Sequence, residues 1–190
     1  EEKLNGYNVR VARVDGDLLA LTRGGYVCPW TTALAREQVP TAFFDEHPAA
    51  TLCVEVVGEE NPYTTFPYPG VDGVALRVFD IRDRQTGQPY PVADRREACA
   101  AYDLSQVPLL GRYSREDAVA AVREHVTTLD EQGREGVVMA SPDGRDCLKY
   151  TTSAIHRADL GHAFALPFDY GRDFLFARII REAFQAVECE

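Results

Sequence analysis

The sequence predicts an α+β fold in which antiparallel sheets are flanked by helices. Runs with the period-two alternation of strands come in pairs joined by short turns, and amphipathic helical segments are mixed among them. The segments lack the regular βαβ order of a doubly wound parallel sheet. At 190 residues, with 45% hydrophobic and 26% charged residues, the chain matches a globular protein, and a chain of this length buries about 70% of its unfolded surface.

The first elements are predicted to form a hairpin. Residues 7–14 (YNVRVARV) alternate as a strand does, Asp15-Gly16 is a residue pair preferred in type I′ turns, and residues 17–22 (DLLALT) form the returning strand. A two-residue loop fixes the register and puts Asn8 opposite Arg23. Arg23 therefore returns to the end of the hairpin nearest the start of the chain.

The middle of the chain contains further strands and helices. We expect a short helix with a threonine cap over residues 31–38 and a mostly apolar strand over residues 51–58. Residues 61–73 (NPYTTFPYPGVDG) show no regular pattern and are predicted to be a loop. Residues 74–81 read as a buried strand and residues 92–103 as a short helix.

The last part of the chain contains the clearest helical pattern. Residues 114–133 have apolar residues at helical spacing, with Ser114 and Asp117 in a capping arrangement and a glycine at the C-terminal end. Residues 135–152 are predicted to form a second hairpin. Residues 173–188 (DFLFARIIREAFQAVE) are predicted to form a second amphipathic helix.

The loop of the second hairpin decides which of its side chains share a face. A three-residue loop, 142–144, closed by a glycine in the left-handed conformation, pairs Ser141 with Arg145. Glu135 and Lys149 then point to the same side of the sheet, whereas a two-residue loop would put them on opposite faces. We predict the three-residue loop, because it brings a carboxylate and a cation onto one surface.

The charge balance excludes a globally basic surface for nucleic acid. The net charge is −10, so any contact with nucleic acid must be local. We expect a strongly hydrated acidic surface of the kind that keeps a protein soluble at high salt. No apolar run approaches the ~20 residues of a membrane span, and the five cysteines form no C-x-x-C pair, so a reducing, cytoplasmic setting is expected.

Lysine is the rare cation of this chain. Only Lys3 and Lys149 are present, against 18 arginines. A lysine amine can attack the α-phosphate of a nucleotide and form a phosphoramidate, whereas a guanidinium is delocalised and always protonated and cannot do so. A chain that uses arginine almost everywhere else is therefore predicted to keep these two lysines for chemistry.

Six short stretches occur in order along the chain: KLNG (3–6), TRGG (22–25), EVVG (55–58), FD (79–80), EGVV (135–138) and LKYTT (148–152). Singly, each has an ordinary explanation, such as an edge-strand carboxylate for Glu55 or a core aromatic for Phe79. Their order resembles the motif series of the covalent nucleotidyltransferases, the superfamily of DNA ligases, RNA ligases and mRNA capping enzymes. KLNGYNVR, TRGGYVCPWTT, EVVGEENPY and LKYTT are most similar to the archaeal homodimeric ATP-dependent RNA ligases.

The resemblance implies an ATP-grasp-like adenylation domain that joins RNA 5′-phosphate and 3′-hydroxyl ends through a lysyl-AMP intermediate. The implied catalytic residues are Lys3, the nucleophile, and Lys149. The residues implied to bind the nucleotide are Asn5, Gly6, Arg10, Arg23, Glu55, Phe79 and Lys149. Glu135 and Glu55 are the implied ligands of Mg²⁺ (or Mn²⁺), ATP is the implied nucleotide, and Asp80 is the polar neighbour of Phe79. The implied partners are RNA ends and a second copy of the protein, bound through a region outside this chain.

Two positions depart from the superfamily pattern. Asn5 stands where the first motif usually has Asp, and Thr151 stands where the last motif often has a second lysine. Three alternatives stay open: the same fold acting on DNA nicks, a GTP-using capping-type transferase, and a non-catalytic module that binds nucleotide or RNA. By resemblance, residues 1–152 form the adenylation core and residues 153–190 a helical continuation, and we expect upstream and downstream regions of a longer protein.

Overall fold

The computed structural model describes residues 1–62 and 64–157, together with positions 176, 179, 180 and 183. The chain divides into two compact units. The first comprises Glu1, Lys3–Leu109 and Met139–Leu148, and the second comprises Glu2, Leu110–Val138 and the chain from Lys149 onward. The predicted α+β class is confirmed, because the described residues form antiparallel sheets with flanking helices.

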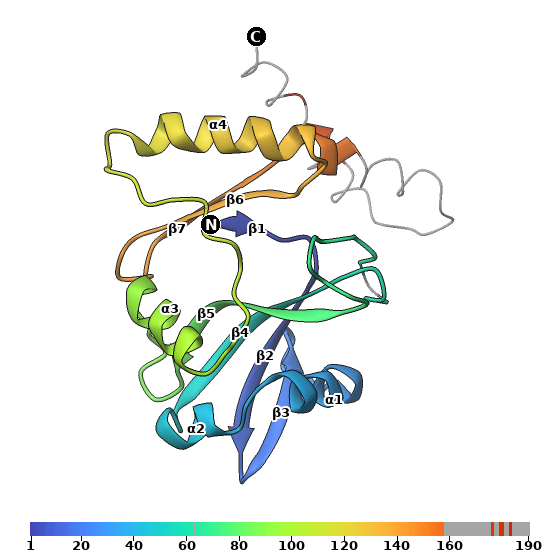
Figure 1. The fold of residues 1–190 in the computed structure, drawn as a ribbon, viewed down its shortest axis with the longest axis vertical. Coiled ribbons are helices and arrows are strands. Elements are labelled where there is room, and N and C mark those ends of the chain that lie inside the picture. The colour runs from blue at the N-terminus through green and yellow to red at the C-terminus, as the bar shows by residue number, and fades with distance from the viewer. Residues whose placement is uncertain (63, 158–175, 177–178, 181–182, 184–190) are drawn as a thin grey trace. The chain divides into compact units, whose positions relative to one another are not determined.

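A four-stranded antiparallel sheet lies at the centre of the first unit (Figure 1). Its strands are β2 (Tyr7–Val14), β3 (Asp17–Thr22), β4 (Ala50–Val57) and β5 (Ala75–Asp83). Their order in the sheet is β3-β2-β4-β5, so β2 and β4 are internal strands. All four were predicted from the sequence pattern, β2 and β3 with the observed ends and β4 and β5 with ends displaced by one or two residues.

The turn between β2 and β3 is the predicted two-residue loop. Asp15 (φ 51°) and Gly16 (φ 90°) both have positive φ, as a type I′ turn requires. The ladder runs back in the predicted register and ends with Val9 opposite Thr22. Arg23 comes directly after this last pair.

Three helices accompany the sheet: α1 (Pro29–Gln38), α2 (Ala42–Glu46) and α3 (Val92–Ala101). α1 packs against β2, β3 and β5, and α3 packs against β5. The threonine cap predicted for α1 is wrong, because the helix begins earlier, at Pro29, whose fixed φ suits the first helical position. Thr32 lies buried instead, and its hydroxyl is bonded to the backbone N–H (3.0 Å) and carbonyl (3.4 Å) of Ala20.

Alternation along the strands separates an apolar face of the sheet from a polar one. The apolar face and the three helices form the main core cluster, which includes Val9, Val11, Leu34, Phe43, Phe44, Leu52, Val54, Val56, Val78 and Cys99. A smaller cluster consists of Leu4, Val57, Tyr68 and Val107, with Phe79 packed against it. Asn8, Arg10 and Glu55 alternate with the valines of the main core and so lie on the polar face.

Strand β5 is irregular at Phe79. Cys53 of β4 pairs with Asp80, but Val54, the next residue, pairs with Val78, so Phe79 is an extra residue in the ladder. Such a β-bulge interrupts the hydrogen-bond ladder and re-aims a side chain. Period-two alternation across residues 74–81 cannot reveal it, because a bulge depends on the partner strand.

α4 (Ala118–Glu131) is the long helix of the second unit and begins four residues later than predicted. The Ser114 hydroxyl donates to the Asp117 carboxylate (2.6 Å) and accepts from the Asp117 N–H (3.1 Å), so this pair closes a turn that precedes the helix. Gly133, with φ 66°, confirms the predicted glycine stop. Neither α4 nor any other helix of the described residues is long and apolar enough to cross a membrane.

A second sheet has the order β1-β6-β7, with β1 (Glu2–Lys3), β6 (Gly136–Ala140) and β7 (Cys147–Thr151). The predicted hairpin of β6 and β7 is confirmed, but its predicted three-residue loop is wrong. The N–H of Ser141 donates to the Asp146 carbonyl (2.9 Å), and that of Thr152 donates to the Glu135 carbonyl (2.9 Å). The loop therefore has four residues. The Ser141 hydroxyl favours it, because it donates to Asp143 (2.6 Å) and accepts from the Asp146 N–H (3.0 Å).

Most of the predicted tail helix, residues 173–188, lies outside the described residues. The four positions that are described, 176, 179, 180 and 183, are helical and exposed.

Candidate active site

The turn after Lys3 is built against strand β4. A Cβ atom at Gly6 would lie 2.3 Å from the Val56 carbonyl oxygen and 2.8 Å from Cγ of Glu55. Only glycine lets the backbone approach β4 this closely. Leu4, one residue after Lys3, is buried in the small apolar cluster. These contacts fix the turn beside Glu55.

Tyr68 holds the next residue of the same turn. Its hydroxyl accepts a hydrogen bond of 2.5 Å from the backbone N–H of Asn5. The tyrosine is 7% exposed, and its ring centroid lies 5.0 Å from that of Phe66. Because the bond uses the backbone of Asn5, it does not depend on whether Asn or Asp stands there. Nothing in the sequence pattern marks Tyr68, which lies in the irregular loop 61–73.

A connected row of polar side chains crosses β2 and β4. Asn8 pairs with Glu55 in the ladder, and its amide donates to the Glu55 carboxylate (3.2 Å). Arg10 donates in turn to the side-chain oxygen of Asn8. Glu55 is half-buried on an internal strand, so the edge-strand explanation of this residue is wrong. Asn8, which sequence motifs do not single out, joins Arg10 to Glu55.

Phe79 is half-buried, with the small apolar cluster on one side and a cation on another. The Arg10 guanidinium lies 5.8 Å from the centroid of the Phe79 ring, within the range of a cation–π interaction. Arg10 therefore connects the aromatic residue to Asn8 and Glu55. The structure brings Asn5, Gly6, Arg10, Glu55 and Phe79 into this one continuous set of contacts.

Burial shifts the pKa values of ionisable groups on β5 and on the neighbouring strand β4. Desolvation raises the pKa of Asp80 and outweighs the opposing effect of Arg82, whose Nε lies 2.9 Å from the carboxylate. Burial also lowers the pKa of the Arg77 guanidinium and raises the pKa of the Cys53 thiol to about 11. Charges interact strongly in such a partly desolvated environment.

Arg23 lies in an exposed turn that follows β3. The N–H of Thr22 donates to the Tyr26 carbonyl (2.8 Å), and that of Gly25 donates to the Thr22 carbonyl (2.9 Å). The Arg23 side chain is exposed. It is therefore presented to solvent, whereas Arg10 is part of the half-buried row on the sheet.

Asn61 anchors the loop that follows β4. It is completely buried, and its side chain donates a hydrogen bond of 2.8 Å to the Val56 carbonyl. Its backbone N–H donates to the Gly58 carbonyl (3.2 Å). Val56 thus meets both this loop and the turn at Gly6, so one carbonyl of β4 positions two segments of the site.

Glu135 and Lys149 belong to the second unit. Glu135 is half-buried and Lys149 is exposed. The observed loop puts Glu135 opposite Thr152, one residue away from the expected partner, and Gly136 (φ 147°) interrupts regular alternation directly after Glu135. The pairing from which a shared face was predicted is therefore wrong, and the roles of these two residues stay predictions.

The second unit also contains a buried ion pair next to the start of β1. Nη2 of Arg134 lies 2.6 Å from Oε1 of Glu2, and the two side chains are 14% and 6% exposed. Burial raises the pKa of Glu2, although Arg134 acts in the opposite direction. The Arg134 carbonyl accepts a hydrogen bond from the Thr152 hydroxyl (2.6 Å), which ties the pair to the end of β7.

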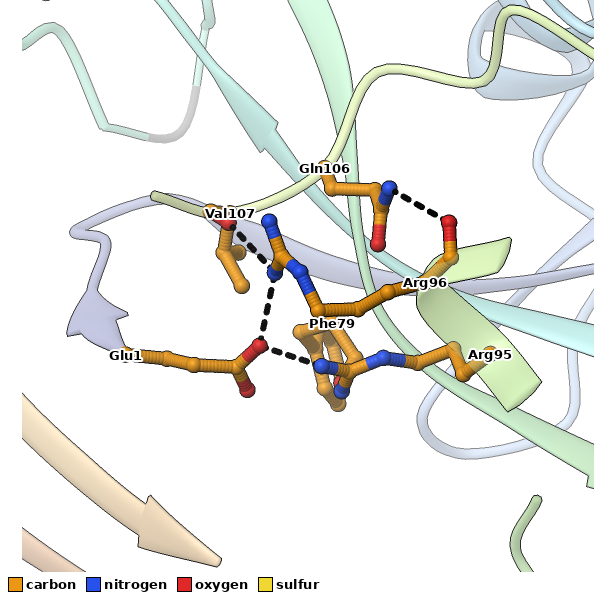
Figure 2. A network of polar contacts seen from close by, with 6 residues as sticks. All are labelled: Glu1, Phe79, Arg95, Arg96, Gln106 and Val107. Atoms are coloured by element: carbon orange, nitrogen blue, oxygen red, sulfur yellow. Dashed lines mark hydrogen bonds and ion pairs between the residues drawn. The ribbon is translucent and has the colours of Figure 1, made fainter. Parts of the chain in front are cut away.

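A second buried ion pair lies in the first unit (Figure 2). The Glu1 carboxylate accepts hydrogen bonds from Arg95 and from Arg96 (2.9 Å). The side chains of Glu1 and Arg95 are 8% and 4% exposed. Two adjacent arginines in a short amphipathic helix are typical of an exposed face, so nothing in the sequence marks Arg95 as buried.

The described residues contain no group of three or more His, Cys, Asp or Glu side chains placed to hold a metal ion. Magnesium needs fewer protein ligands, because it keeps several waters and binds through one or two carboxylates and substrate phosphates. Glu55 fits this requirement, since it is a half-buried carboxylate oriented by Asn8. The donor chemistry therefore suits a Mg²⁺ ion bound together with a nucleotide.

Comparisons with known proteins identify the family of the chain. A family model for RNA ligases matches residues 1–151, and a model for the C-terminal region of ligase Pab1020 matches residues 162–190. An uncharacterized protein of Methanocaldococcus jannaschii is 40% identical over 193 residues, which cover 99% of this chain and 49% of that relative. The chain spans about half the length of the relatives it matches.

Solved structures match over most or all of the chain. An archaeal ATP-dependent RNA ligase is 47% identical, with a TM-score of 0.96, and the match covers 100% of this chain and 52% of that one. A putative ATP-dependent DNA ligase from Aquifex aeolicus is 32% identical, with a TM-score of 0.86, over 100% of this chain and 53% of that one. A Naegleria gruberi RNA ligase, 18% identical with a TM-score of 0.61 over 81% of this chain and 49% of that one, shares the fold.

Proposed function

Since the chain belongs to the RNA ligase family, we propose that it carries the adenylation domain of an ATP-dependent RNA ligase and that Lys3 is the residue that becomes adenylated. The observation that carries the proposal is the turn at Gly6, which is held against Glu55 and Val56 directly after Lys3. The 47% identity to an archaeal ATP-dependent RNA ligase over the whole chain supports ATP and RNA as the substrates.

The proposed reaction consists of three displacements at phosphorus. The Lys3 amine loses a proton and attacks the α-phosphate of ATP, so that a P–N bond forms and the bond to pyrophosphate breaks. An oxygen of an RNA 5′-phosphate then attacks the same phosphorus, the P–N bond breaks, and the RNA end carries AMP in a pyrophosphate linkage. An RNA 3′-hydroxyl finally attacks the RNA 5′-phosphate, loses its proton, and displaces AMP.

Residues of the first unit bind and orient the nucleotide in this proposal. Phe79 supplies an aromatic face for adenine. Glu55 supplies an acceptor for a ribose hydroxyl or a ligand for the metal ion. Arg10 and Arg23 supply positive charge for the phosphates, one from the half-buried row on the sheet and the other from an exposed turn.

The charge that develops on the transferring phosphate needs further cations. Lys149 is proposed as the second catalytic lysine and Glu135 as a metal ligand; both roles rest on the motif resemblance. Mg²⁺ or Mn²⁺ would neutralise phosphate charge when bound. Thr151 is neutral, whereas the last motif of the superfamily often has a second lysine there. The metal ion and the arginines would therefore supply more of the charge stabilisation than they do where both lysines are present.

Covalent labelling tests the proposal. We expect incubation of the full-length protein with α-labelled ATP and Mg²⁺ to leave label on the protein in a denaturing gel, at Lys3. Lys3→Arg, which keeps the charge and removes the nucleophile, should abolish the label. An unlabelled parent protein would contradict the proposal.

A DNA-joining activity is the second candidate, because the putative DNA ligase from Aquifex aeolicus is 32% identical over the whole chain. Joining assays with nicked RNA and nicked DNA, each with ATP or GTP, separate the RNA ligase from the DNA ligase and from a capping-type transferase. Binding of ATP without release of pyrophosphate would indicate a non-catalytic module.

We also propose a homodimer and a cytoplasmic location. The match of residues 162–190 to the C-terminal region of a ligase supports a continuation beyond the adenylation core, and light scattering should give twice the mass of one full-length chain. Among the described residues, the thiols of Cys53, Cys99 and Cys147 form no disulfide, which suits a reducing compartment.

A further inference from the structure

One arginine of α3 connects the segment that bears Lys3 to the strand that bears Phe79. Figure 2 shows the guanidinium groups of Arg95 and Arg96 converging on the Glu1 carboxylate. Glu1 is two residues before Lys3, and in extended chain residues at this spacing lie on the same face. A carboxylate held in place at Glu1 therefore constrains the backbone from which the Lys3 side chain extends.

Arg95 reaches the adenine side of the proposed site through a backbone carbonyl. Its Nη1 donates to the carbonyl oxygen of Phe79, the extra residue of the bulge in β5. A bulge interrupts the hydrogen-bond ladder, and a partly buried carbonyl is stabilised by a donor. Arg95 is that donor, so the position of the Phe79 backbone depends on an arginine whose other nitrogen holds Glu1.

Arg96, Gln106 and Val107 connect the same network to a second carbonyl of β5. Nη1 of Arg96 donates to the Val107 carbonyl (3.4 Å), and the Gln106 amide donates to the Arg96 carbonyl (3.2 Å). The N–H of Val107 donates to the Val78 carbonyl (3.1 Å), directly before Phe79. The network is therefore anchored to β5 at two neighbouring carbonyls.

We propose that Arg95 is a positioning residue, which with Glu1 sets the Lys3 segment in register with Phe79 so that the lysine meets the α-phosphate when adenine is bound. The proposal rests on the proposed function. Arg95 acts through Glu1 and the Phe79 carbonyl and need not touch ATP. A fork of guanidinium donors can bond a carboxylate and a carbonyl at once, whereas a single ammonium group cannot do so in the same geometry.

The two partners of Arg95 predict different kinetic effects. Adenine is part of both ATP and RNA with a preformed 5′-adenylate, so the Phe79 contact matters for Lys3 adenylation and for sealing of the pre-adenylated RNA. The Lys3 amine attacks only in the first of these reactions. Loss of Arg95 should therefore slow both reactions, and loss of the Glu1 charge should slow only the first.

The test measures both reactions in the full-length protein under single-turnover conditions at saturating ATP. Arg95→Met should slow formation of the lysyl-AMP by about 100-fold and should also slow sealing of pre-adenylated RNA. Glu1→Gln, which keeps the side-chain shape, should slow lysyl-AMP formation by about 10-fold and leave sealing unchanged. Arg95→Lys should lie between the parent and Arg95→Met.

Arg13→Met is the matched control. Arg13 also bonds a carboxylate, that of Asp45 (2.5 Å), and the carbonyl of a phenylalanine, Phe44 (2.8 Å), in the same unit but away from the site. We expect its lysyl-AMP formation to equal that of the parent. If Arg13→Met slowed the reaction as much as Arg95→Met, the effect would be general loss of structure and the proposal would be wrong.

The remaining outcomes are also decisive. If folded Arg95→Met forms lysyl-AMP at the parent rate, Arg95 does not position the site. If Arg95→Met does not fold, Glu1→Gln decides, because equal slowing of both reactions in that variant overturns the proposal. If the parent protein forms no lysyl-AMP, the proposed function itself is wrong, and the proposed role of Arg95 is wrong with it.

Discussion

The carbonyl of Val56 shows how single residues shape this site. The turn at Gly6 approaches it from the start of the chain, and the buried side chain of Asn61 donates to it from the loop after β4. Gly6 is therefore required by the position of a backbone atom on another strand. The glycine of the sequence motif around Lys3 is therefore explained by close packing of the turn against β4.

Gly6→Ala tests this constraint. The added Cβ would lie 2.3 Å from the Val56 oxygen, so the turn must move and carry Lys3 with it. We expect lysyl-AMP formation to fall by about 100-fold, as for a displacement of about 1 Å, measured by single-turnover labelling. Gly87→Ala is the control: Gly87 has φ 71°, and an added methyl group there would meet no atom within 4 Å, so that variant should lose some stability and keep its adenylation rate.

Opposing effects act on the carboxyl group of Asp80. Burial, which has the largest effect, favours its neutral form and raises the pKa, whereas the guanidinium groups of Arg82 and Arg95 favour its charged form. A carboxyl whose pKa is raised in the folded state contributes stability that is fully present below its unfolded pKa of about 3.9 and is lost as pH rises through the folded value.

Asp80→Asn should remove this pH dependence. We expect the free energy of unfolding of the parent to fall relative to that of Asp80→Asn from about pH 4 upward. Once Asp80 is fully ionised, the difference between the two proteins should stay constant with pH. Urea titrations of both proteins between about pH 4 and 8 measure the difference. If the free energy of unfolding of the parent instead rose with pH relative to that of Asp80→Asn, the attraction of Arg82 and Arg95 would outweigh burial.

At the scale of elements, strands and turns follow from local pattern, whereas irregularities depend on partners. Asp15-Gly16 predicts its turn because positive φ at both residues is a local requirement. The four-residue loop after β6 was not predicted, because the Ser141 side chain competes with the turn that the glycine favours. The bulge at Phe79 was not predicted either, because it exists only relative to β4.

The residues of the candidate site also form two groups, those that the sequence could predict and those that it could not. Lys3, Glu55 and Phe79 could be selected by their order along the chain, since chemistry restricts which residue types can serve there. Asn8 and Arg95 could not, because each acts through a contact with a side chain or carbonyl on another element. Alternation assigns such residues to a face of a strand or helix but does not say what covers that face.

The loop after β4 has its own prediction. Asn61→Ala leaves the Val56 carbonyl without the side-chain donor, and loss of one partner of a buried hydrogen bond costs about 1–3 kcal/mol. We expect the free energy of unfolding to fall by about this amount and chymotrypsin to cleave the loop 61–73 faster. Gln38→Ala is the control, because the Gln38 amide bonds Val74 and Leu76 from an exposed position; it should leave loop cleavage unchanged.

At the scale of the whole molecule, the charge distribution sets the conditions under which the fold is stable. The net charge is −10, and like charges on the surface repel one another and oppose the compact state. The ion pairs of Glu1 and Glu2 are buried, and salt screens buried pairs much less than exposed charges. Added salt should therefore weaken the repulsion more than it weakens the internal ion pairs.

We expect the urea midpoint of unfolding to rise between 0.05 M and 2 M KCl, because the Debye length falls from about 10 Å at 0.1 M to about 3 Å at 1 M. The triple variant Glu37→Gln, Glu97→Gln and Glu131→Gln removes three exposed carboxylates, one from each of α1, α3 and α4. Its midpoint should be higher than that of the parent at low salt and should change less with KCl. A parent midpoint that is independent of KCl, or an equal salt response in the triple variant, would contradict surface repulsion as the cause.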